Sequence, residues 1–174
     1  PVGAKWAHWQ GTDGISAFEG ARYYLNGIWR PRNNCMMRSL GQTLCSVCKE
    51  QITKITNGVV NTITNTSPAT PAVTVNVPAS QLFAINHIVP AGNGPTYTWK
   101  LDGNVVPGAT GSSWTFNSTS TTPGLHTVQA TVKDNTTMVR SDPSDTMSDS
   151  FTWQVTVNDP TLCNLRVPAF TVSS

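Results

Sequence analysis

The chain has 174 residues, enough for one ordinary domain or two small ones. Only 11% of the residues are charged, against about 25% in typical soluble domains, which excludes a coiled coil and a charge-rich disordered chain. The formal net charge of +2 is too small to indicate a nucleic-acid partner. No apolar run approaches the roughly 20 residues that cross a bilayer, so we predict no membrane span.

Charge and composition change near residue 60. Residues 1–60 carry seven Lys or Arg and three acidic residues, whereas residues 61–174 carry four bases and six acids. Residues 61–71 are polar, β-branched and interrupted by prolines, a composition typical of an extended linker. We therefore predict a first part over 1–60, a linker over 61–71, a second part over 72–158 and a tail over 159–174.

The first part predicts loops followed by one helix. Apolar residues recur near helical spacing at Val47, Ile52, Ile55 and Val59. Ser46 or Thr43 is a suitable cap for the start of this helix. We expect the first part to be small, rich in loops and helical at its end.

The second part alternates apolar and polar residues, the pattern of half-buried strands. Turn signals such as Asp102-Gly103 and Pro123-Gly124 separate these runs. Strands are predicted over 72–77, 81–88, 97–101, 113–116, 125–132 and 151–157. This spacing is typical of an immunoglobulin-like β-sandwich. The predicted fold class is therefore mainly β, an immunoglobulin-like sandwich preceded by the small first part.

The alternation also predicts which side chains form the core of the sandwich. Trp99 is expected at its buried centre, and Val128, Ala130 and Val132 are expected to point inward. In the strand over 81–88 the apolar face is expected to hold Leu82, Ala84 and Ile88. The segment Tyr97-Thr98-Trp99-Lys100-Leu101-Asp102-Gly103 resembles bacterial immunoglobulin-like modules of the polycystic-kidney-disease type.

Four short blocks follow one another in the first part. They are Phe18-Glu19-Gly20-Ala21-Arg22-Tyr23, Gly27-Ile28-Trp29-Arg30-Pro31, Cys35-Met36-Met37 and Leu44-Cys45-Ser46-Val47-Cys48. The series resembles the end of the catalytic domain of the IgA-cleaving zinc metallopeptidase family, with Trp29 where the family usually has Tyr and Leu44 where it usually has Phe. A sandwich after that domain is also similar to members of the family.

The resemblance implies roles for three residues. Met37 would form an apolar floor beneath the metal site, and its alternative is an ordinary core methionine. Glu19 would face a substrate cleft or orient Arg30, and its alternative is an ion pair with Arg22 or Arg30. Arg30 would bind a substrate carboxylate through two hydrogen bonds, or pack its stem on a neighbouring aromatic ring.

The catalytic zinc ligands of such a peptidase are not found in this sequence. Enzymes of this kind hold zinc with a His-Glu-x-x-His helix. The chain has His8, His87 and His126, none of them at that spacing. We expect the ligand helix to lie upstream of Pro1, assign no metal ligand in this chain, expect no cofactor in it, and expect it to be inactive alone.

The four cysteines leave three interpretations open. In an exported protein an even number favours disulfides, with Cys35 bonded to Cys45 or Cys48. A zinc cluster of these three with His8 or Cys163 is the second interpretation. A redox-active Cys-x-x-Cys is the third, although no βαβ pattern surrounds it.

The predicted function is that of a C-terminal fragment of a secreted zinc metallopeptidase, whose parent hydrolyses peptide bonds with zinc-activated water. The parent would act on a protein or peptide substrate, and the sandwich would bind a surface glycan or protein. We expect a secreted or cell-surface protein of a bacterium. The alternative is a non-catalytic adhesive or structural immunoglobulin-like surface protein.

Overall fold

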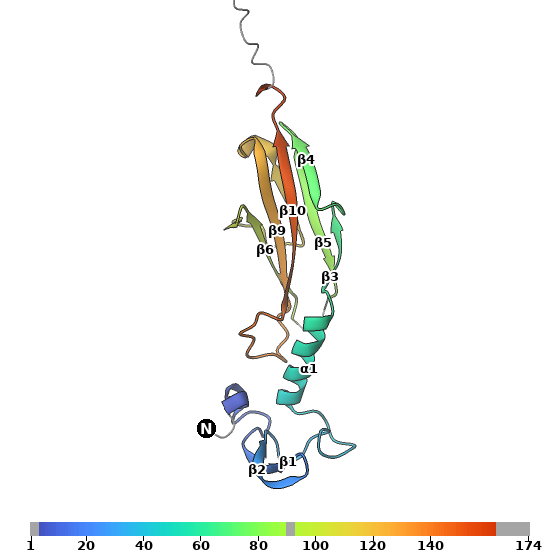
Figure 1. The fold of residues 1–174 in the computed structure, drawn as a ribbon, viewed down its shortest axis with the longest axis vertical. Helices are drawn as coiled ribbons and strands as arrows, with labels where there is room; N and C mark the ends of the chain where they lie inside the picture. The colour runs from blue at the N-terminus through green and yellow to red at the C-terminus, as the bar shows by residue number, and fades with distance from the viewer. Residues whose placement is uncertain (1–3, 90–92, 163–174) are drawn as a thin grey trace, which may run out of the picture. The chain divides into compact units, whose positions relative to one another are not determined.

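The structure, a computed structural model, describes residues 4–89 and 93–162 (Figure 1). The chain divides into two compact units. The N-terminal unit comprises Pro1–Thr62, Val89–Pro95 and Lys133–Asp149, and the sandwich unit comprises Ile63–Ile88, Thr96–Val132 and Ser150–Ser174. The N-terminal unit therefore includes two segments from much later in the sequence. None of the helices in the described ranges is long and apolar enough to cross a membrane.

The N-terminal unit contains little regular structure, as its composition predicted. A 3-10 helix, η1, covers Ala4–Trp9, a hairpin pairs β1 (Phe18–Ala21) with β2 (Tyr24–Arg30), and α1 covers Ser46–Val59. The predicted helix is present, and its N-cap residue is Cys45 rather than Ser46 or Thr43. The Ser46 hydroxyl instead donates to Asp13 Oδ2 at 2.7 Å.

The buried side of α1 differs from the predicted apolar stripe. Ile52, Ile55 and Val59 are largely exposed, and the one fully buried residue of the helix is Glu50. A buried carboxylate is unfavourable unless hydrogen bonds replace its lost water. The position of α1 therefore depends on the partners of this one side chain.

Four donors from two other segments surround the Glu50 carboxylate. His8 Nε2 lies 2.6 Å from Oε2, and the indole N–H of Trp9 donates to the same oxygen at 2.6 Å. The backbone N–H groups of Arg140 and Ser141 donate to Oε1 at 2.8 and 2.9 Å. Burial alone raises the pKa of Glu50, but these hydrogen bonds outweigh it and lower the pKa from 4.5 to about 2.

Arg140 adds a second connection between the same segments. Its guanidinium carbon lies 3.8 Å from the ring centroid of Trp9, a cation–π contact. Its Nη1 donates to Thr12 Oγ1 at 3.2 Å. The ammonium of Lys54, one turn along α1 from Glu50, donates to Ser141 O at 2.9 Å. Residues 140–141 are thus held to η1 and to α1 by side-chain contacts.

The sandwich unit is built from two sheets. Its strands are β3 (Ile63–Ser67), β4 (Ala72–Asn76), β5 (Ser80–His87), β6 (Thr96–Leu101), β7 (Asn104–Val105), β8 (Ser113–Asn117), β9 (Gly124–Lys133) and β10 (Ser148–Asn158). One sheet has the order β4-β10-β9-β6-β7, with β4 parallel to β10, and the other has the order β3-β5-β8. This confirms the predicted mainly β fold and β-sandwich. Within residues 61–71, predicted as an extended linker, β3 pairs with β5.

The core between the sheets is aromatic. Trp99 and Trp153 are fully buried and stacked, with ring centroids 6.0 Å apart, and Phe83 lies 5.0 Å from Trp153. Each indole N–H donates to a backbone carbonyl at 2.9 Å, that of Trp99 to Gly111 and that of Trp153 to Pro68. The large rings are therefore buried with their polar atoms satisfied.

The predicted inward residues are confirmed in β9 and wrong in β5. Val128, Ala130 and Val132 are buried. In β5, however, Phe83 and Ile85 face the core, whereas Leu82 is half exposed. Both faces of this strand carry apolar residues, so alternation alone did not decide between them, and the larger Phe83 ring occupies the core.

We expect Trp99→Ala to destabilise the sandwich by about 3–5 kcal/mol, the range for truncation of a large buried aromatic residue. Because small domains have about 5–15 kcal/mol of total stability, the variant should melt far below the parent. Trp29→Ala is the control, since Trp29 belongs to the N-terminal unit and should leave the melting of the sandwich unchanged. Calorimetry that places Trp99→Ala within a degree or two of the parent would contradict this packing.

We expect Glu50→Gln to loosen α1. An amide has one acceptor oxygen instead of two, so at least one pair of the four donors loses its partner, at a cost of about 3 kcal/mol. Hydrogen exchange in residues 46–59 should accelerate about 100-fold. Glu19→Gln is the matched control, because Glu19 is an exposed carboxylate of the same unit. Equal protection of α1 in both variants would show that Glu50 does not hold the helix.

Protonation of Glu50 in acid should lower the stability of the N-terminal unit. The folded pKa of Glu50 lies below its ordinary value of 4.5, so its stabilisation is complete above that value and is lost as the pH falls towards 2. By pH 3 the loss should be about 2 kcal/mol. Exchange of α1 measured at pH 6 and pH 3 should reveal it, and Glu50→Gln should lack this part of the acid sensitivity. An identical acid response in the variant would refute the assignment.

Candidate functional site

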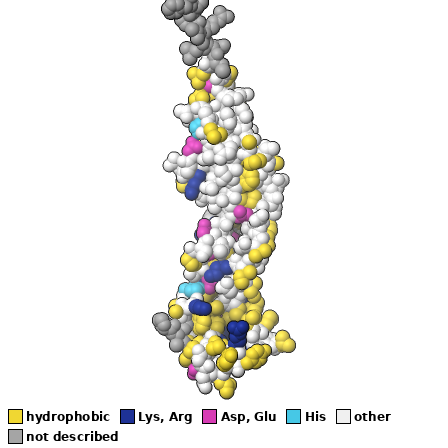
Figure 2. All heavy atoms as spheres, viewed as in Figure 1, with side chains coloured by type: hydrophobic (Ala, Val, Ile, Leu, Met, Phe, Trp, Pro, Cys, Tyr) yellow, Lys and Arg dark blue, Asp and Glu magenta, His cyan; other side chains and the backbone are white. Residues whose placement is uncertain are grey.

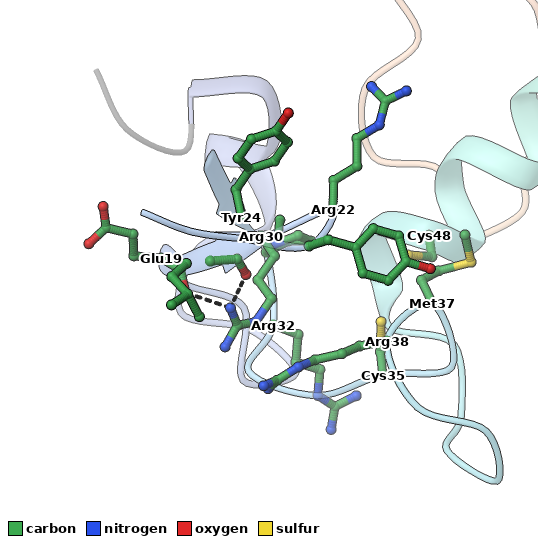
Figure 3. Close-up of a pocket in the computed structure, with 14 residues that line it drawn as sticks. Glu19, Arg22, Tyr24, Arg30, Arg32, Cys35, Met37, Arg38 and Cys48 are labelled. Carbon is green, nitrogen blue, oxygen red and sulfur yellow. Dashed lines mark hydrogen bonds between the residues drawn. The ribbon is translucent and has the colours of Figure 1, made fainter. Parts of the chain in front are cut away.

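One pocket of about 720 Å³ lies in the N-terminal unit (Figure 3). The β1–β2 hairpin, residues 30–38 and the first turn of α1 line it. Glu19, Arg30 and Met37, which the family resemblance singled out, are all among its lining residues. Three residues separated by up to 18 positions in the sequence are thus brought to one cavity.

Arg30 is bound on several sides by its own unit. Its Nη1 donates to the carbonyls of Glu19, at 2.5 Å, and of Gly20. Its Nε and Nη2 donate to Asn33 O at 3.1 Å and to Asn33 Oδ1 at 3.0 Å. The guanidinium therefore joins β1 to the loop after β2, and these hydrogen bonds define the pocket wall.

The bulge in β1 explains why glycine follows Glu19. Gly20 has φ = +87°, and a Cβ placed there would lie 3.1 Å from Leu25 O and 3.3 Å from Arg30 Nη1. Only glycine adopts this conformation without strain and leaves room for the arginine. The Gly20 carbonyl is thereby turned towards the guanidinium.

Glu19 supports the hairpin from its other end. Its Oε1 accepts the backbone N–H of Gly27 at 2.9 Å. Among the residues that the structure describes, Glu19 forms no ion pair with Arg22 or Arg30, so the predicted pairing is not observed. The side chain is exposed. Its carboxylate is thus the one acidic group among four arginines of the pocket lining, which are Arg22, Arg30, Arg32 and Arg38.

The hairpin turn at the pocket has an uncommon backbone. Arg22 and Tyr23 both have positive φ, +51° and +69°, in a two-residue connection that usually contains Asn or Gly. A two-residue hairpin turn of this kind requires positive φ at both positions, a conformation that is unfavourable for residues with large side chains. Tyr23 and Leu25 are almost completely exposed beside this turn.

Large apolar side chains are exposed around the pocket. Met37 is 73% exposed and Leu40 is 95% exposed, in addition to the tyrosines and leucine of the hairpin. Figure 2 shows hydrophobic side chains gathered on the surface of the N-terminal unit, with basic groups among them. Met37 is therefore exposed at the pocket, and within the described residues it packs in neither buried cluster. Contiguous exposed apolar surface of this kind is typical of an interaction site.

Three cysteines gather at the α1 end of the pocket. The sulfur atoms of Cys35, Cys45 and Cys48 all lie within 4.8 Å of one another. All three are free thiols, so the predicted bond from Cys35 to Cys45 or Cys48 is not present among the described residues, and Cys163 lies outside them. Burial, with the neighbouring thiols, raises the pKa of Cys48 to about 12.

The histidines do not form a catalytic zinc centre in the described part of the chain. His8 is engaged by Glu50, His87 by the Tyr97 hydroxyl at 2.6 Å and His126 by Asp102 at 2.7 Å. Asp102 raises the pKa of His126 through this hydrogen bond. Within the described residues the three thiols are the one group with ligand atoms close enough to share a metal ion. The residues present therefore do not fit the histidine-held zinc of a peptidase.

The contribution of residues 133–149 to the N-terminal unit was missed by the sequence analysis. Asp142 accepts from the backbone N–H groups of Thr146 and Met147 at 3.0 and 2.9 Å and so shapes this segment. Burial raises the pKa of Asp142, but these bonds and that from the Thr146 hydroxyl lower it below its usual range. The segment Asp142-Pro143-Ser144-Asp145 does signal a turn, but nothing in it signals the distant partner Glu50.

Comparison with known proteins supports the family assigned from the motif blocks. No curated protein matches the chain. The family model described as IgA Peptidase M64 matches residues 4–56, which include the hairpin, the pocket arginines, Met37 and the three cysteines. The match ends before the sandwich begins. Residues 4–56 are therefore similar to the IgA peptidase M64 family, over less than half of the chain.

Proposed function

We propose that residues 1–60 form the C-terminal part of the catalytic domain of a secreted zinc metallopeptidase, and that the sandwich is its accessory module. The observation that carries this proposal is the coincidence of two facts. Residues 4–56 match a peptidase family, and the three residues assigned by resemblance all line one pocket within that match.

The exposed apolar surface around the pocket supports the same proposal. Most of the side chain is exposed to water in Tyr23, Leu25, Met37 and Leu40. Leaving this much apolar surface in water is unfavourable, and such a surface is commonly covered by a partner. A remaining part of the catalytic domain, carrying the His-Glu-x-x-His helix, would cover it. In that complete domain a bound zinc ion supplies an activated water for peptide hydrolysis.

The residues of this chain would shape the substrate side of the cleft. Arg30 binds the Glu19 and Gly20 carbonyls, which supports a role in positioning the hairpin rather than in binding a substrate carboxylate. Met37, an exposed thioether on the pocket wall, would supply the apolar floor. Arg22, which projects from the strained turn (Figure 3), would attract carboxylate groups of a peptide.

The sandwich would extend the reach of the enzyme. Its core is complete and aromatic, so it would act as a stable spacer or as a docking module for a surface glycan or protein. A non-catalytic adhesive protein is the competing function, and the upstream sequence of the gene product distinguishes the two.

We expect the 174-residue chain alone to show no peptidase activity, and the whole gene product to cleave casein peptides in a chelator-sensitive manner. In the whole product Met37→Ala should lower kcat/KM about 10- to 100-fold, the range for residues that support a metal site. Met36→Ala is the matched control, because Met36 is a neighbouring exposed methionine outside the pocket lining.

Two results would overturn this function. One is a whole gene product without a His-Glu-x-x-His motif, which would favour the adhesive protein. The other is chelator-sensitive cleavage by the chain alone, because its described residues hold no histidine centre.

A further inference from the structure

The three thiols of the N-terminal unit come from two pieces of chain that meet at the start of α1. Cys45 is the N-cap residue and Cys48 lies one turn further along the helix. Cys35 reaches them from the loop after β2, which a hydrogen bond from Met36 N to Thr43 O closes at 3.1 Å. The three sulfurs lie within 4.8 Å of one another, and two of the residues are buried.

We propose that Cys35, Cys45 and Cys48 bind one zinc ion as thiolates, with water from the pocket as the fourth ligand. Tetrahedral zinc with Zn–S bonds of about 2.3 Å separates its sulfurs by about 3.8 Å. The Cys45 and Cys48 sulfurs are 3.5 Å apart. This spacing is that of two thiols in hydrogen-bonding contact, and it lies within a few tenths of an ångström of the sulfur separation around zinc, whereas a disulfide needs about 2.05 Å.

The number of thiols also favours a metal over a disulfide. A disulfide would join two of the sulfurs and leave the third unpaired beside it. A single divalent cation engages all three at once.

The fourth coordination position faces the pocket. Cys35 and Cys48 both belong to the pocket lining, whereas Cys45 is fully buried behind them. Figure 3 shows the Cys35 and Cys48 side chains together at the α1 end of the cavity. Solvent therefore has access to the side of the cluster that the protein leaves open.

The small core of the unit gives such an ion a structural role. The buried hydrophobic cluster here consists of Trp9, Ile15, Cys35 and Cys45, so half of its buried members are cysteines. Small units with so little apolar core commonly need a metal or a disulfide for stability. The site differs in ligands and position from the histidine-held zinc of the proposed peptidase, and it does not depend on peptidase activity.

The chain, purified under reducing conditions and loaded with Zn²⁺, should retain one zinc ion after dialysis, measured by plasma mass spectrometry. Loading with Co²⁺ should give thiolate-to-cobalt charge-transfer absorption and the visible bands of tetrahedral cobalt. Cys48→Ser should lose both signals. Cys163→Ser is the matched control and should retain both signals.

Alkylation of the folded parent provides a second readout that needs no variant. Zinc should protect Cys35, Cys45 and Cys48 from iodoacetamide, and a chelator should expose them and accelerate hydrogen exchange in α1. Absence of bound metal after loading, with all three thiols equally reactive with and without Zn²⁺, would overturn the proposal. A disulfide between two of them in the purified chain, followed by no metal uptake once that disulfide has been reduced, would also overturn it. Loss of the bound zinc in Cys163→Ser would contradict water as the fourth ligand, because it would show that Cys163 occupies that place.

Discussion

The buried carboxylate of Glu50 is the interaction on which the N-terminal unit depends. It accepts hydrogen bonds from η1 and from residues 140–141. One side chain of α1 thus joins three segments that are far apart in the sequence. Removing a carboxylate from water costs several kcal/mol unless its lone pairs are satisfied. Here both oxygens are satisfied, and the carboxylate therefore selects one arrangement of these segments over others.

The site follows from the position of α1. The helix begins at Cys45, so fixing it also fixes Cys45 and Cys48. Cys35 packs against them, and the loop that carries Cys35 continues from the strand that ends in Arg30. Arg30 in turn binds the two carbonyls of the bulge in β1. A sequence of short-range contacts thus connects the buried carboxylate to the far wall of the pocket.

Sequence patterns predicted the sandwich well because its determinants are local. Alternation located its principal strands, and the turn residues Asp102 and Gly103 adopt the positive φ that the hairpin requires. The pattern failed for β5, where Leu82 and Phe83 are both apolar and only three-dimensional packing selects the ring for the core. Periodicity defines the faces of a strand, but not which face is buried.

The site was only partly predictable, for a different physical reason. The motif blocks indicated Glu19, Arg30 and Met37 as candidates, but not the hydrogen bonds that Arg30 forms with Glu19 and Asn33. The partners of Glu50 lie 41 to 91 residues away in the sequence, beyond the reach of any local pattern. The sequence grouped Cys35, Cys45 and Cys48 but left a disulfide and a zinc cluster both open, and only the fold brings the three sulfurs within 4.8 Å of one another.

The late arrival of residues 140–141 has a consequence for biosynthesis. Ribosomes add about 5–20 residues each second, so about 5–20 seconds separate the synthesis of Glu50 from that of its donors at Arg140 and Ser141. During this interval the carboxylate has only part of its final shell and remains hydrated. Although most of its residues are made before the sandwich, the N-terminal unit therefore completes its fold only after β3 to β9 have been translated.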